Sequence, residues 1–155
     1  MRMKGDLTSA NPFSLPKNSI KNCKSLTLTG KIDVWTTSSK LYLGFGTNLY
    51  SSGYIVIDST NIKRYYNTTS LKETDNVAHG LTFTNNIQVN LAVNWGKATI
   101  NIVSNGVMFT TTLENGIGDN GDIFAKIENG SLTDCSFGFY SEVIKCDNWL
   151  FGDAL

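Results

Sequence analysis

Short segments in which apolar and polar residues alternate run along most of this chain, and this period of two constrains the fold more than any other feature. The longest segment covers residues 25–35, where one face would carry Leu26, Leu28, Ile32 and Val34. Side chains of a β-strand point to alternate faces of a sheet, so the pattern predicts a strand with one buried face. Apolar residues do not recur at helical spacing over ten or more positions, so we expect little helix.

Turn-forming residues separate the other predicted strands. An Asp-Ser-Thr-Asn turn at 58–61 joins two of them, and turns at 94–97 and 104–106 join the next three. Residues 67–80 are polar and are expected to form a loop. Many short strands between turns predict an all-β fold, which we take to be a two-sheet antiparallel β-sandwich of jelly-roll type. The predicted strands are 25–35, 40–46, 54–58, 61–66, 87–93, 98–103, 107–113, 123–127, 135–140 and 142–151.

The chain is predicted to form one domain. Its 155 residues, 41% of them hydrophobic, can bury a core without help from disulfides or metal. Residues 1–24 carry Pro12 and Pro16 among polar residues and are expected to be an extended lead-in. The sandwich would then occupy residues 25–155.

The charge balance limits the partners. Thirteen basic and thirteen acidic residues cancel, which disfavours binding to nucleic acid or to an anionic membrane surface. No apolar run approaches the roughly eighteen residues of a membrane helix. The low charged fraction of 17%, with many Asn, Thr, Ser and Gly residues, suits an extracellular or cell-surface protein, or alternatively a phage particle. No apolar segment typical of a secretion signal follows residues 1–6.

Three cysteines, Cys23, Cys135 and Cys146, allow at most one disulfide. Their spacing matches no zinc-binding pattern, so buried free thiols are the expected state.

The C-terminal residues 149–155, Trp-Leu-Phe-Gly-Asp-Ala-Leu, resemble the start of a GDSL (SGNH) hydrolase domain, whose first block ends in Gly-Asp-Ser-Leu. Residues 62–66, 79–82, 123–126 and 131–135 resemble the β-sandwich domain that precedes such hydrolases in gut-bacterial proteins. The resemblance covers the chain from about Asn11 onward. It implies an accessory domain similar in layout to concanavalin-A-like lectins, followed by a hydrolase. The alternative is that residues 147–151 are an ordinary closing strand.

The hydrolase-like block is not expected to be catalytic. The resemblance places Gly152, Asp153 and Ala154 where the family has Gly, Asp and the nucleophilic Ser, and alanine has no nucleophilic atom. The single histidine, His79, lies upstream rather than downstream, so no general base follows the block. A true esterase would require Ala154 to be a replacement. His79 itself is expected to bond to the backbone.

Aromatic side chains are the candidates for ligand binding. Sugars stack on exposed aromatic rings while Asn, Asp and Gln bond their hydroxyl groups. Trp95 lies at a predicted hairpin turn, and the pair Tyr65–Tyr66 places one ring on each face of a strand. The competing interpretation for each residue is core or strand-edge packing. The candidates are Trp35, Tyr65, Tyr66 and Trp95.

Two acidic segments offer oxygen ligands for calcium, and ordinary turn chemistry is the competing interpretation of both. They are the loop with Asp119, Asn120 and Asp122, and the turn with Asp58 and Asn61. Neither matches an ordered calcium motif, so no cofactor is expected, a structural calcium ion being the one alternative.

The leading functional hypothesis is a non-catalytic accessory domain that binds glycans or envelope polysaccharide and is attached to a GDSL-type esterase. The second hypothesis is a structural or interaction domain, for example in a phage tail or fibre or as a spacer, with no glycan ligand.

Overall fold

The computed structural model describes residues 2–15, 23–45, 54–67, 71–94, 97–113 and 123–141. Every element in these ranges is a β-strand and every pairing is antiparallel, which confirms the predicted fold class. No helix among these residues is long and apolar enough to span a membrane. The strands are β1 (Arg2–Thr8), β2 (Phe13–Leu15), β3 (Cys23–Phe45), β4 (Tyr54–Ile57), β5 (Asn61–Asn67), β6 (Leu71–Ala78), β7 (Asn86–Asn94), β8 (Lys97–Ser104), β9 (Val107–Leu113) and β10 (Ile123–Ser141).

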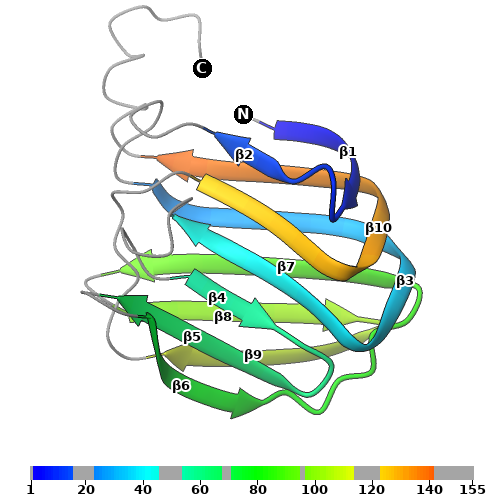
Figure 1. The fold of residues 1–155 in the computed structure, drawn as a ribbon. Coiled ribbons are helices and arrows are strands. Elements are labelled where there is room, and N and C mark those ends of the chain that lie inside the picture. The colour runs from blue at the N-terminus through cyan, green and yellow to red at the C-terminus, as the bar shows by residue number, and fades with distance from the viewer. Residues whose placement is uncertain are drawn as a thin grey trace, which may run out of the picture.

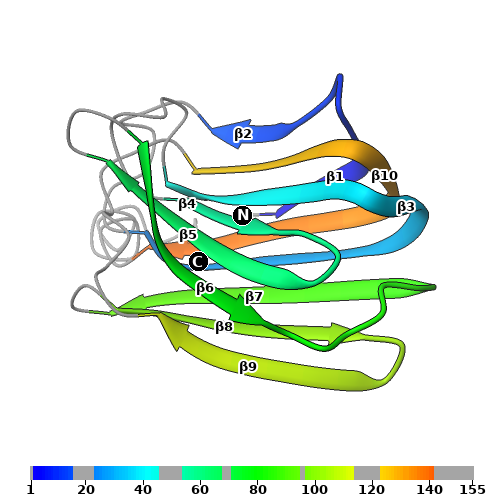
Figure 2. The same cartoon turned by 60° about the horizontal axis from the view of Figure 1, so that its bottom comes forward.

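Two long strands, β3 and β10, run through both layers of the sandwich (Figures 1 and 2). The front sheet in Figure 1 has the order β2, first half of β10, second half of β3, β4, β5, β6. The back sheet has the order β1, second half of β10, first half of β3, β7, β8, β9. The ten strands therefore form one continuous hydrogen-bonded sheet, which folds over into two layers at β3 and β10.

A paired bend in β3 and β10 makes this passage between layers. Residues 36–39 of β3 lie opposite Asn129 alone, between the pairs Trp35–Gly130 and Lys40–Glu128. The buried Ser39 hydroxyl accepts a hydrogen bond of 2.7 Å from the Thr36 N–H and donates one to the Asn129 carbonyl. A Cβ atom on Gly130 would lie 2.8 Å from the Val34 carbonyl oxygen, so the two strands approach too closely there for a side chain.

The core fills the space between the sheets with aliphatic and aromatic side chains from nearly every strand. Alternate residues of each strand supply it, as the period of two predicts. Its fully buried members include Leu28, Leu41, Ile57, Ile62, Ile102, Ile127, Leu132 and Phe137. Arg64 also points inward and is fully buried.

Three expectations from the sequence are corrected by the strands. Residues 2–15 are not a lead-in outside the sandwich, because β1 and β2 pair with β10 and place Leu7 and Phe13 in the core. Residues 71–78, expected to lie in a loop, form the edge strand β6. A polar strand is stable there because it needs few inward apolar residues, and of these Val77 packs on the core.

The third correction concerns Val34, which is 46% exposed although Leu26 and Leu28 are buried as predicted. The register of β3 and β10 shifts between the pairs Ile32–Leu132 and Val34–Ser131, which leaves Asp33 as an extra residue. Such a bulge reverses the alternation of faces, so a strict period of two fails at this point. The segment expected at 142–151 lies outside the described residues.

Candidate functional site on the outward face of the front sheet

Four aromatic side chains from four strands meet on the outward face of the front sheet. Leu41, Leu43 and Ile55 point into the core, so their strand neighbours Tyr42 and Tyr54 point outward. Tyr65 lies directly opposite Tyr54, and Phe124 follows on β10 beyond Gly44, which pairs with both Tyr54 and Phe124. We call this group the tyrosine cluster; it consists of Tyr42, Tyr54, Tyr65 and Phe124.

Tyr54 is the centre of the tyrosine cluster. Its ring stacks on Tyr65 with centroids 5.4 Å apart and an interplanar angle of 24°. It also meets Tyr42 at 5.8 Å and the edge of Phe124 at 6.4 Å. Tyr54 is only 4% exposed, whereas Tyr42, Tyr65 and Phe124 are half-buried. The three outer rings therefore offer the accessible aromatic surface, and Tyr54 holds them together.

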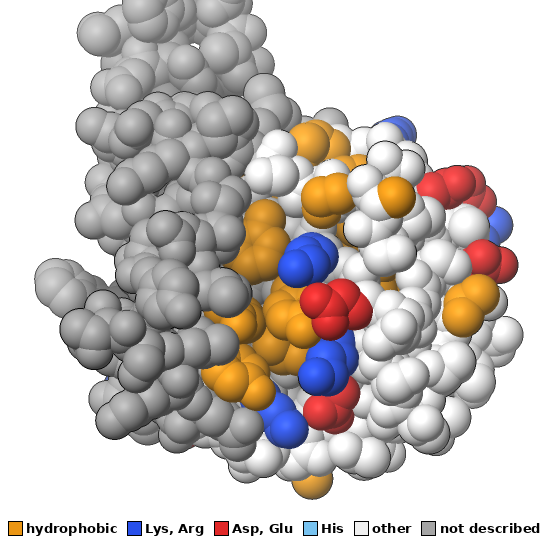
Figure 3. All heavy atoms as spheres, viewed as in Figure 1, with side chains coloured by type: hydrophobic (Ala, Val, Ile, Leu, Met, Phe, Trp, Pro, Cys, Tyr) orange, Lys and Arg blue, Asp and Glu red, His pale blue; other side chains and the backbone are white. Residues whose placement is uncertain are grey.

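Charged side chains of both signs border this aromatic surface. The Lys126 ammonium lies 5.1 Å from the centroid of the Tyr42 ring and 3.6 Å from a carboxylate oxygen of Glu128. The Lys63 ammonium lies 3.8 Å from the Asp58 carboxylate. Figure 3 shows hydrophobic side chains gathered on this face, with basic and acidic side chains alternating beside them. The surface therefore combines apolar area with hydrogen-bonding groups and little net charge.

The hydroxyl groups of Tyr42 and Tyr54 stay protonated to high pH. Burial, together with the hydrogen bond that Tyr42 donates to Glu128 at 2.9 Å, raises the pKa of Tyr42 well above 10.0. Burial also raises the pKa of Tyr54, with a smaller effect from the neighbouring Tyr65. Neutral hydroxyl groups can both donate and accept hydrogen bonds, as a ligand rich in hydroxyl groups requires.

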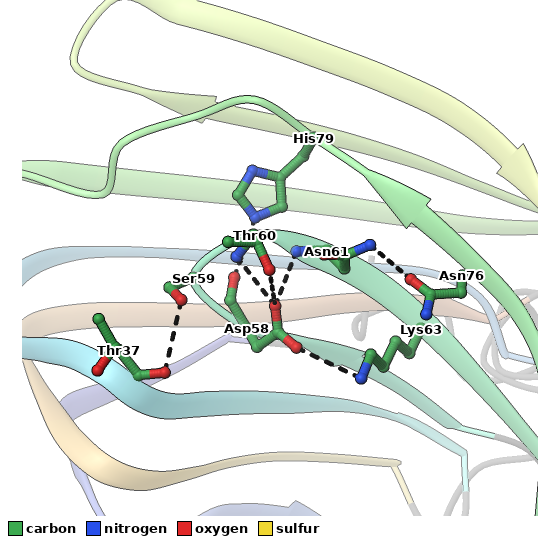
Figure 4. A network of polar contacts seen from close by, with 8 residues as sticks. All are labelled: Thr37, Asp58, Ser59, Thr60, Asn61, Lys63, Asn76 and His79. Carbon is green, nitrogen blue, oxygen red and sulfur yellow. Dashed lines mark hydrogen bonds and ion pairs between the residues drawn. The ribbon is translucent and has the colours of Figure 1, made fainter.

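A network of polar contacts fixes the β4–β5 turn (Figure 4). The Asp58 Oδ1 atom accepts hydrogen bonds from the N–H groups of Thr60 and Asn61, at 2.9 and 2.7 Å, and from the Thr60 hydroxyl at 3.3 Å. The Asn61 amide donates to the Asn76 side chain on β6 at 2.6 Å. Asp58 and Asn61 thus serve turn chemistry, the competing interpretation that the sequence left open against calcium binding.

The Asp58 carboxylate is stabilised in its charged form. Burial alone would raise the pKa of Asp58, but the hydrogen bonds from Thr60 and Asn61 and the ammonium of Lys63 outweigh burial and lower it. Asp58 therefore remains ionised at neutral pH and anchors Lys63 at the edge of the outward face.

His79 is bonded to the backbone, as expected. The ring is 5% exposed; its Nδ1 accepts a 2.9 Å hydrogen bond from the Leu81 N–H, and its Nε2 lies 3.0 Å from the Asp58 carbonyl. Since Nδ1 accepts, Nε2 carries the proton and donates to the carbonyl. The described residues hold no group of three or more His, Cys, Asp or Glu that could bind a metal ion.

Of the aromatic candidates from the sequence, Tyr65 lies in the tyrosine cluster. Trp35 lies near the bend of β3, where its ring meets Phe83 edge-on at 4.9 Å and packs against the core, so it is not part of this surface. Tyr66 lies in β5 opposite Lys72. The Tyr66 side chain is not among the described parts of the chain. The other candidates outside the described residues are Trp95, Asp119, Asn120, Asp122, Gly152, Asp153 and Ala154. Cys135 is a buried free thiol, as expected.

Tyr42, Tyr54 and Phe124 were not identified as site residues from the sequence. Tyr42 and Phe124 each occupy an outward position between two buried residues, and Tyr54 occupies one next to the buried Ile55. An aromatic residue in the polar phase of a strand is the signal that could have identified them. That they meet depends on the register of β10 against β3 and β4, which local patterns do not specify.

The back sheet carries a depression of about 540 Å³ at its outward face, and most of the residues that line it are polar. Its lining includes Lys31, Asn85, Gln88, Asn105 and Asp134 and no aromatic ring. It lacks the flat apolar surface that the tyrosine cluster offers, so the front sheet is the stronger candidate site.

No protein-family model matches the sequence, and no curated protein sequence matches it significantly. Solved structures are similar in fold. The galectin LEC-6 of Caenorhabditis elegans aligns with a TM-score of 0.60 and 13% identity over 87% of this chain and 93% of that chain. A toad ovary galectin in complex with N-acetylgalactose aligns with a TM-score of 0.50 and 13% identity over 84% and 100%.

A β-fructofuranosidase of Schwanniomyces occidentalis, complexed with fructosyl-erythritol, aligns with a TM-score of 0.59 and 15% identity over 88% of this chain and 32% of that chain. At these identities the likeness concerns the fold. The chain has a jelly-roll sandwich similar in fold to the galectins, which confirms the jelly-roll type that the sequence predicted.

Proposed function

We propose that this chain is a non-catalytic glycan-binding domain whose binding surface is the outward face of the front sheet. The observation that carries the proposal is the tyrosine cluster, in which Tyr42, Tyr65 and Phe124 keep accessible ring area around the buried Tyr54. Accessible aromatic rings are seldom gathered on one face of a protein unless that face takes part in an interaction, so such a patch indicates an interaction site.

The chemistry around the rings favours sugars over other ligands. Pyranose rings present apolar C–H faces that stack on aromatic rings, and their hydroxyl groups bond to side chains such as Lys126, Glu128 and Lys63. These charges are paired, Lys126 with Glu128 and Lys63 with Asp58, so the surface has no excess field to attract a highly charged polymer. A neutral polysaccharide is the expected ligand class.

The fold also supports a glycan as the class of ligand. Structural neighbours include galectins, one of them in complex with N-acetylgalactose. They also include a β-fructofuranosidase, of which this chain matches 32% of the length. Since fold does not fix function, the proposal rests on the surface and takes only support from the fold.

We further propose that the domain serves a GDSL-type esterase and brings it to glycans of the cell surface or envelope. Residues 149–155, with Ala154 at the nucleophile position, support this attachment by resemblance. An extracellular or cell-surface location follows from the proposal. Sequencing the source gene beyond codon 155 tests it: further hydrolase blocks with a late Asp-x-x-His would support the attachment, and a stop codon would contradict it.

Electrophoresis through gels that contain neutral galactan, glucan or mannan tests glycan binding. We expect one of these polysaccharides to retard the protein and Tyr65→Ala to weaken its affinity about fivefold, since an aromatic contact contributes about 1 kcal/mol. Tyr65→Phe should keep the ring contact. Gln88→Ala, on the outward face of the back sheet, should bind like the unchanged protein.

Thermal unfolding must first show that the variants are folded. Retardation that Tyr65→Ala leaves unchanged would contradict the assignment of the site. The absence of retardation by every polysaccharide would contradict glycan binding and favour the alternative, a structural or interaction domain, for example in a phage particle.

A further inference from the structure

Strand β9 is an edge strand without the features that usually prevent edge-to-edge pairing. Figure 2 shows it at the margin of the back sheet, and β8 is its one hydrogen-bonded neighbour among the described strands. Its sequence, Val-Met-Phe-Thr-Thr-Thr-Leu, contains no charge, proline or glycine, and its register with β8 is regular over all seven residues. Val107 and Met108 are 57% and 65% exposed.

The other three edge strands in the described part of the chain are protected. β1 carries Arg2, Lys4 and Asp6 and a register shift after Gly5. β2 has three residues and lies between Pro12 and Pro16. β6 carries Lys72, Glu73 and Asp75, and its register with β5 also shifts. Charges, bulges, prolines and short length are the devices that block strand addition, so their absence from β9 alone distinguishes this edge.

The β8–β9 turn determines which backbone groups of β9 face the open edge. Asn105 and Gly106 have φ angles of 51° and 78°, as in a type I′ two-residue hairpin, so Ser104 and Val107 form a hydrogen-bonded pair. Hydrogen-bonded and non-bonded pairs alternate along an antiparallel ladder. The N–H and C=O groups of Met108, Thr110 and Thr112 therefore point away from β8.

We propose that a second copy of this chain pairs antiparallel along β9 and forms a homodimer with one continuous sheet. A two-fold axis at Thr110 places Thr110 opposite Thr110 and Met108 opposite Thr112. Each of these is a hydrogen-bonded pair, because the three residues carry the outward backbone groups. The strand is self-complementary in this register, since it brings no like charges together.

Side chains on the outward face of the back sheet support the same register. A line of hydrogen bonds crosses four strands: the Thr27 hydroxyl donates to Asn90 at 3.0 Å, the Asn90 amide to Asn101 at 3.4 Å, and the Asn101 amide to the Thr110 hydroxyl oxygen at 2.8 Å. Thr110 thus accepts from within its own sheet and keeps its hydroxyl hydrogen for another acceptor. In the dimer the two lines meet at the paired Thr110 residues.

Sedimentation equilibrium at a series of protein concentrations tests the dimer. We expect the dimer mass for the unchanged chain and the monomer mass for Thr110→Lys, which places two like charges at the two-fold axis. Gln88→Lys adds the same charge to the same sheet away from the edge and should remain dimeric. A monomeric unchanged chain, or a dimeric Thr110→Lys variant, would overturn the proposal.

Amide hydrogen exchange of the unchanged protein gives a second readout that needs no variant. In the dimer the amides of Met108, Thr110 and Thr112 are protected from exchange, whereas in a monomer with an open β9 edge they exchange quickly. The amides of Phe109 and Thr111 are bonded to β8 and are protected in both the monomer and the dimer. A dimer in which the first three amides exchange quickly uses another surface and would contradict the assignment to β9. Neither readout depends on glycan binding, so this proposal and the proposed function can fail separately.

Discussion

The Tyr42 hydroxyl donates a 2.9 Å hydrogen bond to Glu128 Oε2 and thereby joins β3 to β10 on the outward face of the front sheet. This bond fixes the orientation of one accessible ring of the tyrosine cluster. It also connects the ring to Lys126, which contacts both the Tyr42 ring and the Glu128 carboxylate.

The raised pKa of Tyr42 predicts a stability difference that depends on pH. A group whose pKa is raised by folding stabilises the folded state below its unfolded pKa of about 10 and loses that contribution as pH rises further. At neutral pH, Tyr42→Phe should lower the free energy of unfolding by about 1 kcal/mol through the lost hydrogen bond. Above pH 10 this deficit should shrink. Urea unfolding of Tyr42→Phe and of the unchanged protein, at neutral pH and above pH 10, measures this deficit. A deficit that is the same at both pH values would count against the Tyr42–Glu128 contact.

The lowered pKa of Asp58 predicts the opposite dependence at acid pH. Asp58→Ala removes the acceptor that closes the β4–β5 turn and should cost about 1–2 kcal/mol at neutral pH. A carboxylate whose pKa is lowered by folding contributes stability above its ordinary value of 3.8 and loses it as pH falls through the folded value. The deficit should therefore narrow below about pH 4.

Asp58→Asn is the matched control for the turn, because an amide oxygen can still accept from Thr60 and Asn61 while the attraction to Lys63 is lost. Its deficit at neutral pH should be smaller than that of Asp58→Ala. Equal deficits for the two variants would show that the turn does not depend on the side-chain acceptor.

The hydrogen bonds of His79 predict that this residue stabilises the fold and takes no part in chemistry. His79→Ala leaves the buried Leu81 N–H and the Asp58 carbonyl without their partners and should destabilise the fold by roughly 1–3 kcal/mol. Denaturant unfolding checks this value. A fully stable His79→Ala variant would mean that water replaces the ring and that the geometry described for this turn is not required.

Gly30 and Cys135 are predicted to be energetically coupled. A Cβ atom on residue 30 would lie 2.8 Å from the Cys135 sulfur, while its other neighbours are at 3.4 Å or more. Gly30→Ala should therefore destabilise the protein by about 1–3 kcal/mol. The cost should fall in a Cys135→Ala background, where the sulfur is absent. A double-mutant cycle measures the coupling, and equal costs in both backgrounds would refute it.

Much of the fold follows from local sequence patterns. The hairpins β4–β5, β7–β8 and β8–β9 were predicted because their strands alternate and turn residues such as Asp58 and Gly106 separate them. Strands β1 and β6 were not, because an edge strand can be polar on both faces. The joining of two predicted strands into β3, and of two into β10, was also missed, because bends such as the one at Gly130 resemble turns in sequence.

The candidate site was predicted less completely than the fold. Tyr65 could be selected because adjacent aromatic residues place one ring on each face of a strand. Tyr54 and Phe124, which belong to the same cluster, lie 11 and 59 positions away from Tyr65 in the chain. Their meeting is a consequence of strand order and register, which tertiary packing sets. Trp35 is an opposite example, because the sequence suggests it for ligand binding and in the structure its ring packs on Phe83.

Glycan binding by the front sheet is tested most directly by an NMR titration of the ¹⁵N-labelled protein with an oligosaccharide cut from the neutral polysaccharide that retards it. We predict that amide signals of Tyr42, Tyr54, Tyr65 and Phe124 shift as the sugar is added, while those of Gln88 and Asn105 on the back sheet do not. Shifts confined to the back sheet, or no shifts at saturating sugar, would contradict glycan binding by the front sheet.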